Sequence, residues 1–186
     1  MIRTIVKYGH PALRTKGAAI ESVTPEIAEL ARDMVETMRA ARGVGLAAQQ
    51  VGVPLQLAVI DVAGIEDRPS EMRIDGQAVP IENWMPLILL NPELELGEEK
   101  EIGNEGCLSF PEMSAEISRA VSVRARARLL DGRALDFEAS GLLARALQHE
   151  CDHLHGILFI DRMNSATKAT LAGRLKRLQK EAAAAL

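Results

Sequence analysis

Three residues with metal-binding and proton-transfer chemistry stand close together in the stretch QHECDHLHG, residues 148–156: His149, Glu150 and His153. In a helix, histidines four residues apart project from the same face, one turn apart. Neutral imidazoles bind divalent metals well, and the adjacent Glu150 is placed to accept a proton from water at such a site. The H-E-x-x-H pattern is typical of metal hydrolase helices. The stretch therefore predicts a metal site carried by a helix.

A catalytic metal needs a third protein ligand, and Cys107 is the best candidate. It lies in NEGCLSFPE, residues 104–112, where a glycine-containing turn at a strand end can present the sulfur to a cavity. Burial as a small apolar residue explains that segment equally well on its own. Cys151 lies about 200° around the helix from the first histidine, so we assign it to packing. We assign His10 and His155 to the surface.

A third segment, GVGLAAQQ at residues 43–50, can bring its backbone close to another group because it holds two glycines and two alanines. It lacks the lysine and hydroxyl residues of a phosphate-binding loop. Its glutamines, Gln49 and Gln50, offer neutral hydrogen-bond donors. Taken alone, the segment is also typical of a tight turn.

Three helices are predicted around these segments. Thr24 as an N-cap and apolar residues at helical spacing predict the first over residues 24–41. The second, over 141–155, carries the histidines and has Ser140 as its expected cap. The third, over 164–186, has few apolar residues and several lysines and arginines. That composition is typical of a half-exposed terminal helix, and the alternative is a docking element for an acidic partner.

The other elements are predicted to be strands. Apolar runs indicate strands over residues 55–62 and 85–96. Strict alternation around an Asp-Gly turn predicts a β-hairpin over 121–139, with a row of arginines on its solvated face. Residues 64–83 are polar and rich in glycine and proline, which predicts a long surface loop or an insertion.

The 186 residues and their ordinary hydrophobic fraction, 47%, suit one domain over residues 1–186. A formal net charge of -4 argues against a protein that binds nucleic acid over its whole surface. No apolar run is long enough to span a bilayer, and the N-terminus has no secretory pattern. We therefore expect a cytoplasmic protein that has no membrane partner and whose two cysteines are free thiols.

In this order, GVGLAAQQ, EGCLS and HECDH resemble the three signature segments of the peptide deformylase family. The resemblance covers most of the chain and implies an α+β fold, with antiparallel sheets packed around a central metal-binding helix and a C-terminal helix. It also implies a role for each matched position. The expected metal ligands are Cys107, His149 and His153. The other implied residues are Glu150 as general acid–base, Gln50 and the Leu108 N–H as oxyanion donors, and Gly45 as a substrate contact.

The resemblance implies a hydrolase that removes the N-formyl group from the N-terminal methionine of nascent polypeptides and releases formate. We expect Val44, Leu108 and Leu142 to line the slot for the methionine side chain. Iron(II) is the implied metal, although the ligand set also suits zinc, nickel or cobalt. Two residues near that slot differ from what family members often have: an aliphatic residue where Arg145 stands, and a bulkier residue where Gly103 stands.

Two other functions compete with this interpretation. A zinc peptidase would share the H-E-x-x-H helix, but such enzymes usually take their third ligand from downstream, and His155, Asp161 and Glu181 lie at no familiar spacing. A non-catalytic protein with a structural metal would need four protein ligands, and only three are convincing. A nascent-chain substrate also makes the ribosome a possible partner for the basic C-terminal helix.

Overall fold

The computed structural model describes all of residues 1–186 and contains three α-helices, nine strands and four short 3-10 helices. The α-helices are α1 (Pro25–Ala40), α2 (Leu142–Leu154) and α3 (Ser165–Ala184). The strands are β1 (Gly45–Ala47), β2 (Leu57–Ile60), β3 (Ser70–Ile74), β4 (Gln77–Val79), β5 (Leu87–Leu96), β6 (Lys100–Cys107), β7 (Phe110–Ala120), β8 (Ser122–Arg128) and β9 (Ala134–Gly141). The 3-10 helices are η1 (Pro11–Arg14), η2 (Ala48–Val51), η3 (Ile81–Trp84) and η4 (Phe159–Arg162).

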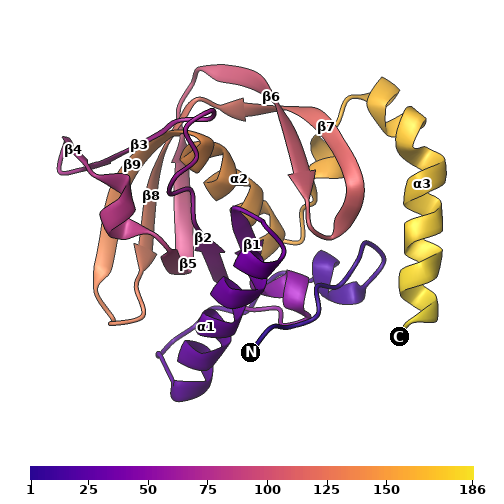
Figure 1. Ribbon diagram of the computed structural model, residues 1–186, viewed down its shortest axis with the longest axis horizontal. Coiled ribbons are helices and arrows are strands. Elements are labelled where there is room, and N and C mark those ends of the chain that lie inside the picture. Colours follow the sequence, from indigo (N-terminus) through magenta and orange to yellow (C-terminus); the bar gives the residue numbers. More distant parts are fainter.

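Two antiparallel sheets enclose α2 (Figure 1). The larger sheet has the strand order β1-β2-β5-β8-β9-β3-β4, and the smaller is the ribbon β6-β7. Twelve of the 13 residues of α2 are buried, because the helix packs against strands of both sheets. This arrangement confirms the predicted α+β fold with a central helix.

The helices α1 and α2 begin in different ways. Thr24 caps α1 as predicted, because its hydroxyl accepts a hydrogen bond from the backbone N–H of Ile27. The cap predicted for α2 is wrong, since Ser140 still pairs within the sheet as part of β9. Instead, the Ser70 hydroxyl on the neighbouring β3 accepts from the Leu143 N–H at 2.9 Å.

The surface loop predicted over residues 64–83 is wrong for half of its length. Residues 70–79 form the β3-β4 hairpin, which pairs with β9 and extends the large sheet. Its turn is Asp75-Gly76, where both residues have positive φ, as a two-residue hairpin turn requires. Met72 on β3 is fully buried against the core, and this burial explains why a mostly polar stretch is ordered as a strand.

The hairpin predicted over 121–139 is present as β8 and β9. One face buries Val123, Ala125 and Ala127, while Arg124 and Arg126 on the other face are exposed. Arg128 on that face is half-buried, because its guanidinium donates to the backbone carbonyls of Ile20 and Glu21. Arg124 and Arg126 pair with Asp136 on the neighbouring strand. The solvated strand face predicted for the arginine row is therefore confirmed at Arg124 and Arg126 but not at Arg128.

The C-terminal helix α3 runs along one side of the molecule, at the edge of the β6-β7 ribbon (Figure 1). Leu171, Leu175 and Leu178 bury its apolar face in a cluster that also holds Phe110 and Phe159. Its lysines and arginines are exposed. No helix in the molecule combines the length and the apolarity needed to cross a membrane.

Candidate active site

The three predicted metal ligands converge in the structure. One candidate ligand atom from each of Cys107, His149 and His153 lies within 4.8 Å of the other two. The Cys107 sulfur is 3.4 Å from Nε2 of His153. Typical metal–sulfur and metal–nitrogen bonds place such atoms about 3.5 Å apart around a tetrahedral ion. The donor set therefore fits a divalent metal.

Local structure explains how residues so far apart in sequence meet. Cys107 is the last residue of β6, at the point where the register with β7 shifts and the chain turns through Leu108 and Ser109. The two histidines are one turn apart on α2, with ring centroids 5.0 Å from each other. Because α2 is enclosed by both sheets, its histidine face points inward toward the end of β6.

Hydrogen bonds orient the imidazoles. Nδ1 of His149 lies 2.9 Å from the Glu105 carboxylate, so its Nε2 is left for a metal. His153 directs Nε2 toward the Cys107 sulfur. Its Nδ1 is buried and has no protein partner.

The Glu105 carboxylate is the centre of a buried ion-pair network that the sequence did not reveal. It accepts two hydrogen bonds from Arg119, at 2.8 and 2.9 Å, and one from Arg145 at 2.8 Å. Arg119 also pairs with Asp152 at 2.6 Å. Burial alone would raise the pKa of the Glu105 carboxyl, but Arg119 and His149 hold that pKa well below its usual range. Glu105 therefore fixes both the histidine ring and two buried cations.

Glu105→Gln is expected to destabilise the fold by about 3–5 kcal/mol, because it leaves two buried guanidinium groups without their shared anion. Urea unfolding in the presence of a chelator would measure this loss without any contribution from bound metal. Glu116→Gln is the matched control, since Glu116 is an exposed glutamate on the neighbouring strand β7. An equal, small effect of both changes would contradict the role assigned to Glu105.

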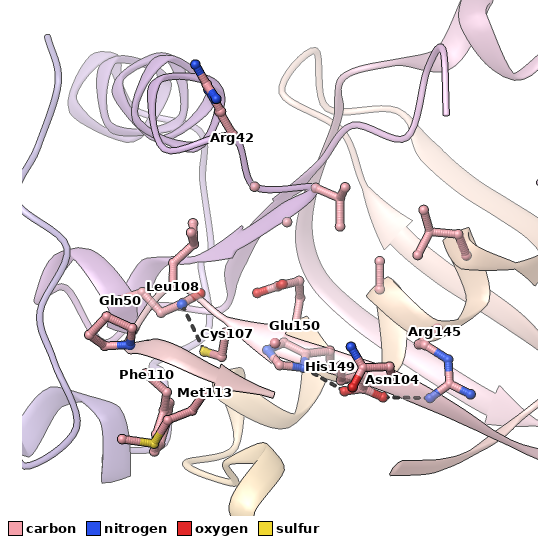
Figure 2. A pocket seen from close by; sticks show the side chains of 18 of the residues that line it. Arg42, Gln50, Asn104, Cys107, Leu108, Phe110, Met113, Arg145, His149 and Glu150 are labelled. Carbon is pink, nitrogen blue, oxygen red and sulfur yellow. Dashed lines mark hydrogen bonds and ion pairs between the residues drawn. The ribbon is translucent and has the colours of Figure 1, made fainter. Parts of the chain in front are cut away.

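Glu150 lies beside the candidate metal ligands and faces the pocket (Figure 2). Its Oε2 is buried without a protein partner, and burial raises the pKa of the carboxyl to about 7. Gly45 on β1 lies directly against this carboxylate. A Cβ built on Gly45 would overlap Oε1 of Glu150, so only glycine leaves the carboxylate in this position.

Gln50 is held with its amide group toward Cys107. Its Oε1 accepts from the Ala47 N–H at 2.9 Å, which leaves Nε2 to donate to the Cys107 sulfur at 3.5 Å and to the Ser109 hydroxyl at 3.3 Å. The adjacent Gln49 is fully buried, and its amide makes no hydrogen bond. Of the two glutamines, Gln50 is therefore the one that faces the site.

The N-terminal segment supports both sides of the site, which sequence analysis missed. The Val6 N–H donates to the Gln50 carbonyl at 2.8 Å, and the Tyr8 N–H donates to the Ser109 carbonyl at 3.0 Å. Between them, Nζ of Lys7 donates to the Leu108 carbonyl at 3.0 Å. These contacts connect the segment of Gln50 with the segment of Leu108 and Ser109, which lie more than 50 residues apart in the sequence. Nothing in the pattern of the first ten residues predicts these contacts.

The remaining histidines and the second cysteine lie away from this cluster. His10 caps η1 by accepting from the Ala12 N–H, and Nδ1 of His155 lies 2.8 Å from the Cys151 carbonyl. Cys151 is a buried free thiol, and burial raises its pKa to about 12. The packing role predicted for Cys151 agrees with this placement.

A pocket of about 500 Å³ opens beside the candidate ligands (Figure 2). It is lined by all four residues predicted to contact substrate: Val44, Gly45, Leu108 and Leu142. Gln50, Cys107, His149 and Glu150 also line it, whereas His153 lies behind the wall. A ligand in this pocket would therefore contact the general-base candidate, one histidine and the cysteine together.

Comparison with known proteins identifies relatives over nearly the whole chain. The sequence model of the polypeptide deformylase family matches residues 2–169. The chain is 46% identical over 180 residues to a peptide deformylase of Methylacidiphilum infernorum, covering 97% of this chain and 94% of the relative. It is 40% identical to one of Opitutus terrae, covering 95% and 92%.

The fold is also similar to solved structures of peptide deformylases. A peptide deformylase from Ehrlichia chaffeensis matches with a TM-score of 0.82 and 31% identity, covering 100% of both chains. One from Thermotoga maritima matches with a TM-score of 0.74 and 33% identity, covering 88% of this chain and 99% of that one.

Proposed function

Because the chain belongs to the polypeptide deformylase family, we propose that its activity resides in the site formed by Cys107, His149, His153 and Glu150. The protein is a metal-dependent hydrolase that removes the formyl group from the N-terminal methionine of nascent polypeptides and releases formate. The convergence of three metal-ligand atoms within 4.8 Å, beside a pocket that a buried glutamate faces, is the observation that carries the assignment.

The proposed roles follow from where each group lies. Cys107, His149 and His153 would hold one divalent cation, and that cation would supply Lewis-acid chemistry, acidifying a water and polarising the formyl carbonyl. Glu150 takes a proton from the attacking water and returns it to the leaving amine. Nε2 of Gln50 and the backbone N–H of Leu108 stabilise the negative charge that develops on the formyl oxygen.

The pocket suits the substrate side chain. Val44, Leu108 and Leu142 offer apolar surface for methionine, and Gly45 lets the substrate backbone approach closely. Gly45 also lies against the Glu150 carboxylate, which supports a substrate backbone bound beside the proposed base. These four residues are proposed to bind the substrate.

We propose iron(II) as the working metal, which the family resemblance implies. One thiolate and two imidazoles also suit zinc, nickel and cobalt, so the donor set is compatible with each. We further propose that residues 1–186 act as one catalytic domain in the cytoplasm.

Formate release from formyl-Met-Ala-Ser by the metal-loaded protein tests this function. The expected result is stoichiometric formate and free Met-Ala-Ser, with no cleavage of internal peptide bonds. Internal cleavage would favour the alternative, a zinc peptidase. That alternative is not favoured by the family membership, and the third candidate ligand lies upstream of the helix rather than downstream.

We propose that α3 docks the enzyme on ribosomal RNA through exposed lysines. Leu171, Leu175 and Leu178 hold the helix on the domain, so removing it would expose core residues, and charge reversal is the cleaner test. Lys176→Glu with Lys180→Glu is expected to weaken ribosome cosedimentation and to flatten its salt dependence by about one unit of slope per lost phosphate contact.

Lys16→Glu with Lys100→Glu is the matched control, because both lysines are exposed and the net charge changes equally. Formate release from the free tripeptide should be the same in both double variants. Equal loss of ribosome binding in both would show a general charge effect and remove α3 as the docking element.

A further inference from the structure

Arg145 occupies the wall of the substrate pocket one helical turn from the candidate metal centre. It precedes His149 by four residues on α2, a rise of about 6 Å along the helix. Leu142 and Ala146 line the pocket beside it. A substrate whose formyl group lies at His149 and Glu150 therefore extends its side chain toward the end of Arg145. This step rests on the binding mode proposed above.

The guanidinium group of Arg145 is buried within the wall, and Gly103 makes room for it. A Cβ built on Gly103 would lie 2.8 Å from Nη2, 2.9 Å from Cζ and 3.1 Å from Nε. Similar distances to three atoms of the planar group mean that Gly103 covers one of its faces. Arg145 lines the pocket, and Gly103 does not.

Arg145 uses only part of its donor capacity inside the protein. Nη1 donates to Glu105 at 2.8 Å and to the Ile117 carbonyl at 2.9 Å, and Nη2 donates to the Glu101 carbonyl at 3.2 Å. The N–H on Nε and the second N–H on Nη2 make no hydrogen bond within the protein. A guanidinium carries five such donors, so two are left over.

The charge of Arg145 is also only partly balanced. Its one acidic partner is Glu105, which accepts two further hydrogen bonds from Arg119. When two buried cations share one carboxylate, the charge of each is only partly neutralised. An electron-rich group that approaches such a cation therefore stabilises it. In this pocket, that group would come from the side chain of the substrate.

We propose that Arg145 is a specificity-determining residue that selects N-terminal side chains carrying a hydrogen-bond acceptor. The thioether of methionine is a weak acceptor, and the isosteric norleucine side chain has none. The oxygen of methionine sulfoxide is a strong one. The enzyme should therefore also deformylate peptides whose N-terminal formylmethionine has been oxidised, a substrate that a wholly apolar pocket would reject.

The test compares kcat/KM for three peptides that differ only in the first side chain: formyl-Met-Ala-Ser, formyl-norleucyl-Ala-Ser and the methionine sulfoxide form of the first. The measured quantity is the sulfoxide-to-norleucine ratio, which does not depend on how much of a variant is folded or metal-loaded. Arg145→Leu is expected to lower this ratio by about tenfold to a hundredfold, the effect of losing one hydrogen bond from a charged donor. Arg145→Lys, which keeps a cationic donor, should restore part of it.

Two further variants separate the local contact from other effects. In Gly103→Ala the added methyl group displaces the guanidinium without removing it, so the ratio should also fall. This variant tests the proposal even if Arg145→Leu does not fold. Arg68→Leu removes a more exposed cation at the pocket mouth and should leave the ratio unchanged. An unchanged ratio in Arg145→Leu and Gly103→Ala, or an equal fall in Arg68→Leu, would overturn the proposal. If the wild type releases no formate from formyl-Met-Ala-Ser, the proposed function itself fails.

Discussion

Replacing Glu150 with alanine is expected to reduce kcat for formate release by about 10²–10⁴-fold, the usual contribution of a positioned general acid–base. The bound metal should remain, because the three proposed ligands are untouched. Glu150 is buried beside them, and its Oε2 has no protein partner, so no other side chain in the structure holds it for a structural purpose. Stopped-flow or coupled formate assays with parallel metal analysis would measure both quantities.

Glu116→Ala is the matched control for this change, since it removes an exposed carboxylate from β7 outside the pocket. Its kcat should equal that of the wild type. Glu150→Ala protein that keeps both its metal and most of its activity would exclude Glu150 as the proton carrier. Protein that loses both would instead indicate a structural role for this carboxylate.

Elements specified by local pattern were predicted correctly. The α1 helix follows from its Thr24 cap and apolar spacing, and the β8-β9 hairpin follows from alternation around an Asp-Gly turn. Within the site, the four-residue spacing of His149 and His153 predicts that both project from one helix face. These patterns are read within one or two helical turns, so no knowledge of the rest of the fold is needed.

Contacts between residues far apart in the sequence could not be predicted from such local patterns. From residue types alone, Cys107 could equally have been a buried packing residue or a metal ligand. Only the resemblance to a family predicted that it lies beside the histidines. Glu105 and Arg119 look like ordinary surface charges in sequence, because charged residues are seldom fully buried. Their burial depends on partners from separate elements, such as His149 on α2.

The β3-β4 hairpin shows how tertiary structure overrides composition. An Asp-Gly pair such as Asp75-Gly76 is a hairpin signal, but the polar residues around it favoured a loop. The large sheet supplies what the segment lacks, since β9 pairs with β3 and the core buries Met72. Pairing with an existing strand edge stabilises a stretch that would form no hairpin alone.

Cys107→Ala is expected to remove both the metal and the activity. It deletes one of three proposed ligands, so metal affinity should fall by more than the roughly 10- to 100-fold that loss of an outer-shell partner costs. The thiol is a half-buried group at a strand end, and its removal leaves a small space rather than a buried charge. The apo fold should therefore survive the change.

The melting temperature with and without added metal separates these two effects. A ligand that binds only the folded state stabilises it by about 4 kcal/mol at 1,000 times its Kd, so the wild type should show a large upward shift on metal addition. Cys107→Ala should melt near the apo wild type and show little shift. Cys151→Ala is the matched control, because that buried thiol is not part of the Cys107, His149 and His153 cluster and its loss should leave the metal-dependent shift intact. A full shift in Cys107→Ala would mean that the sulfur 3.4 Å from His153 is not a ligand, and the assignment of the whole site would have to be abandoned.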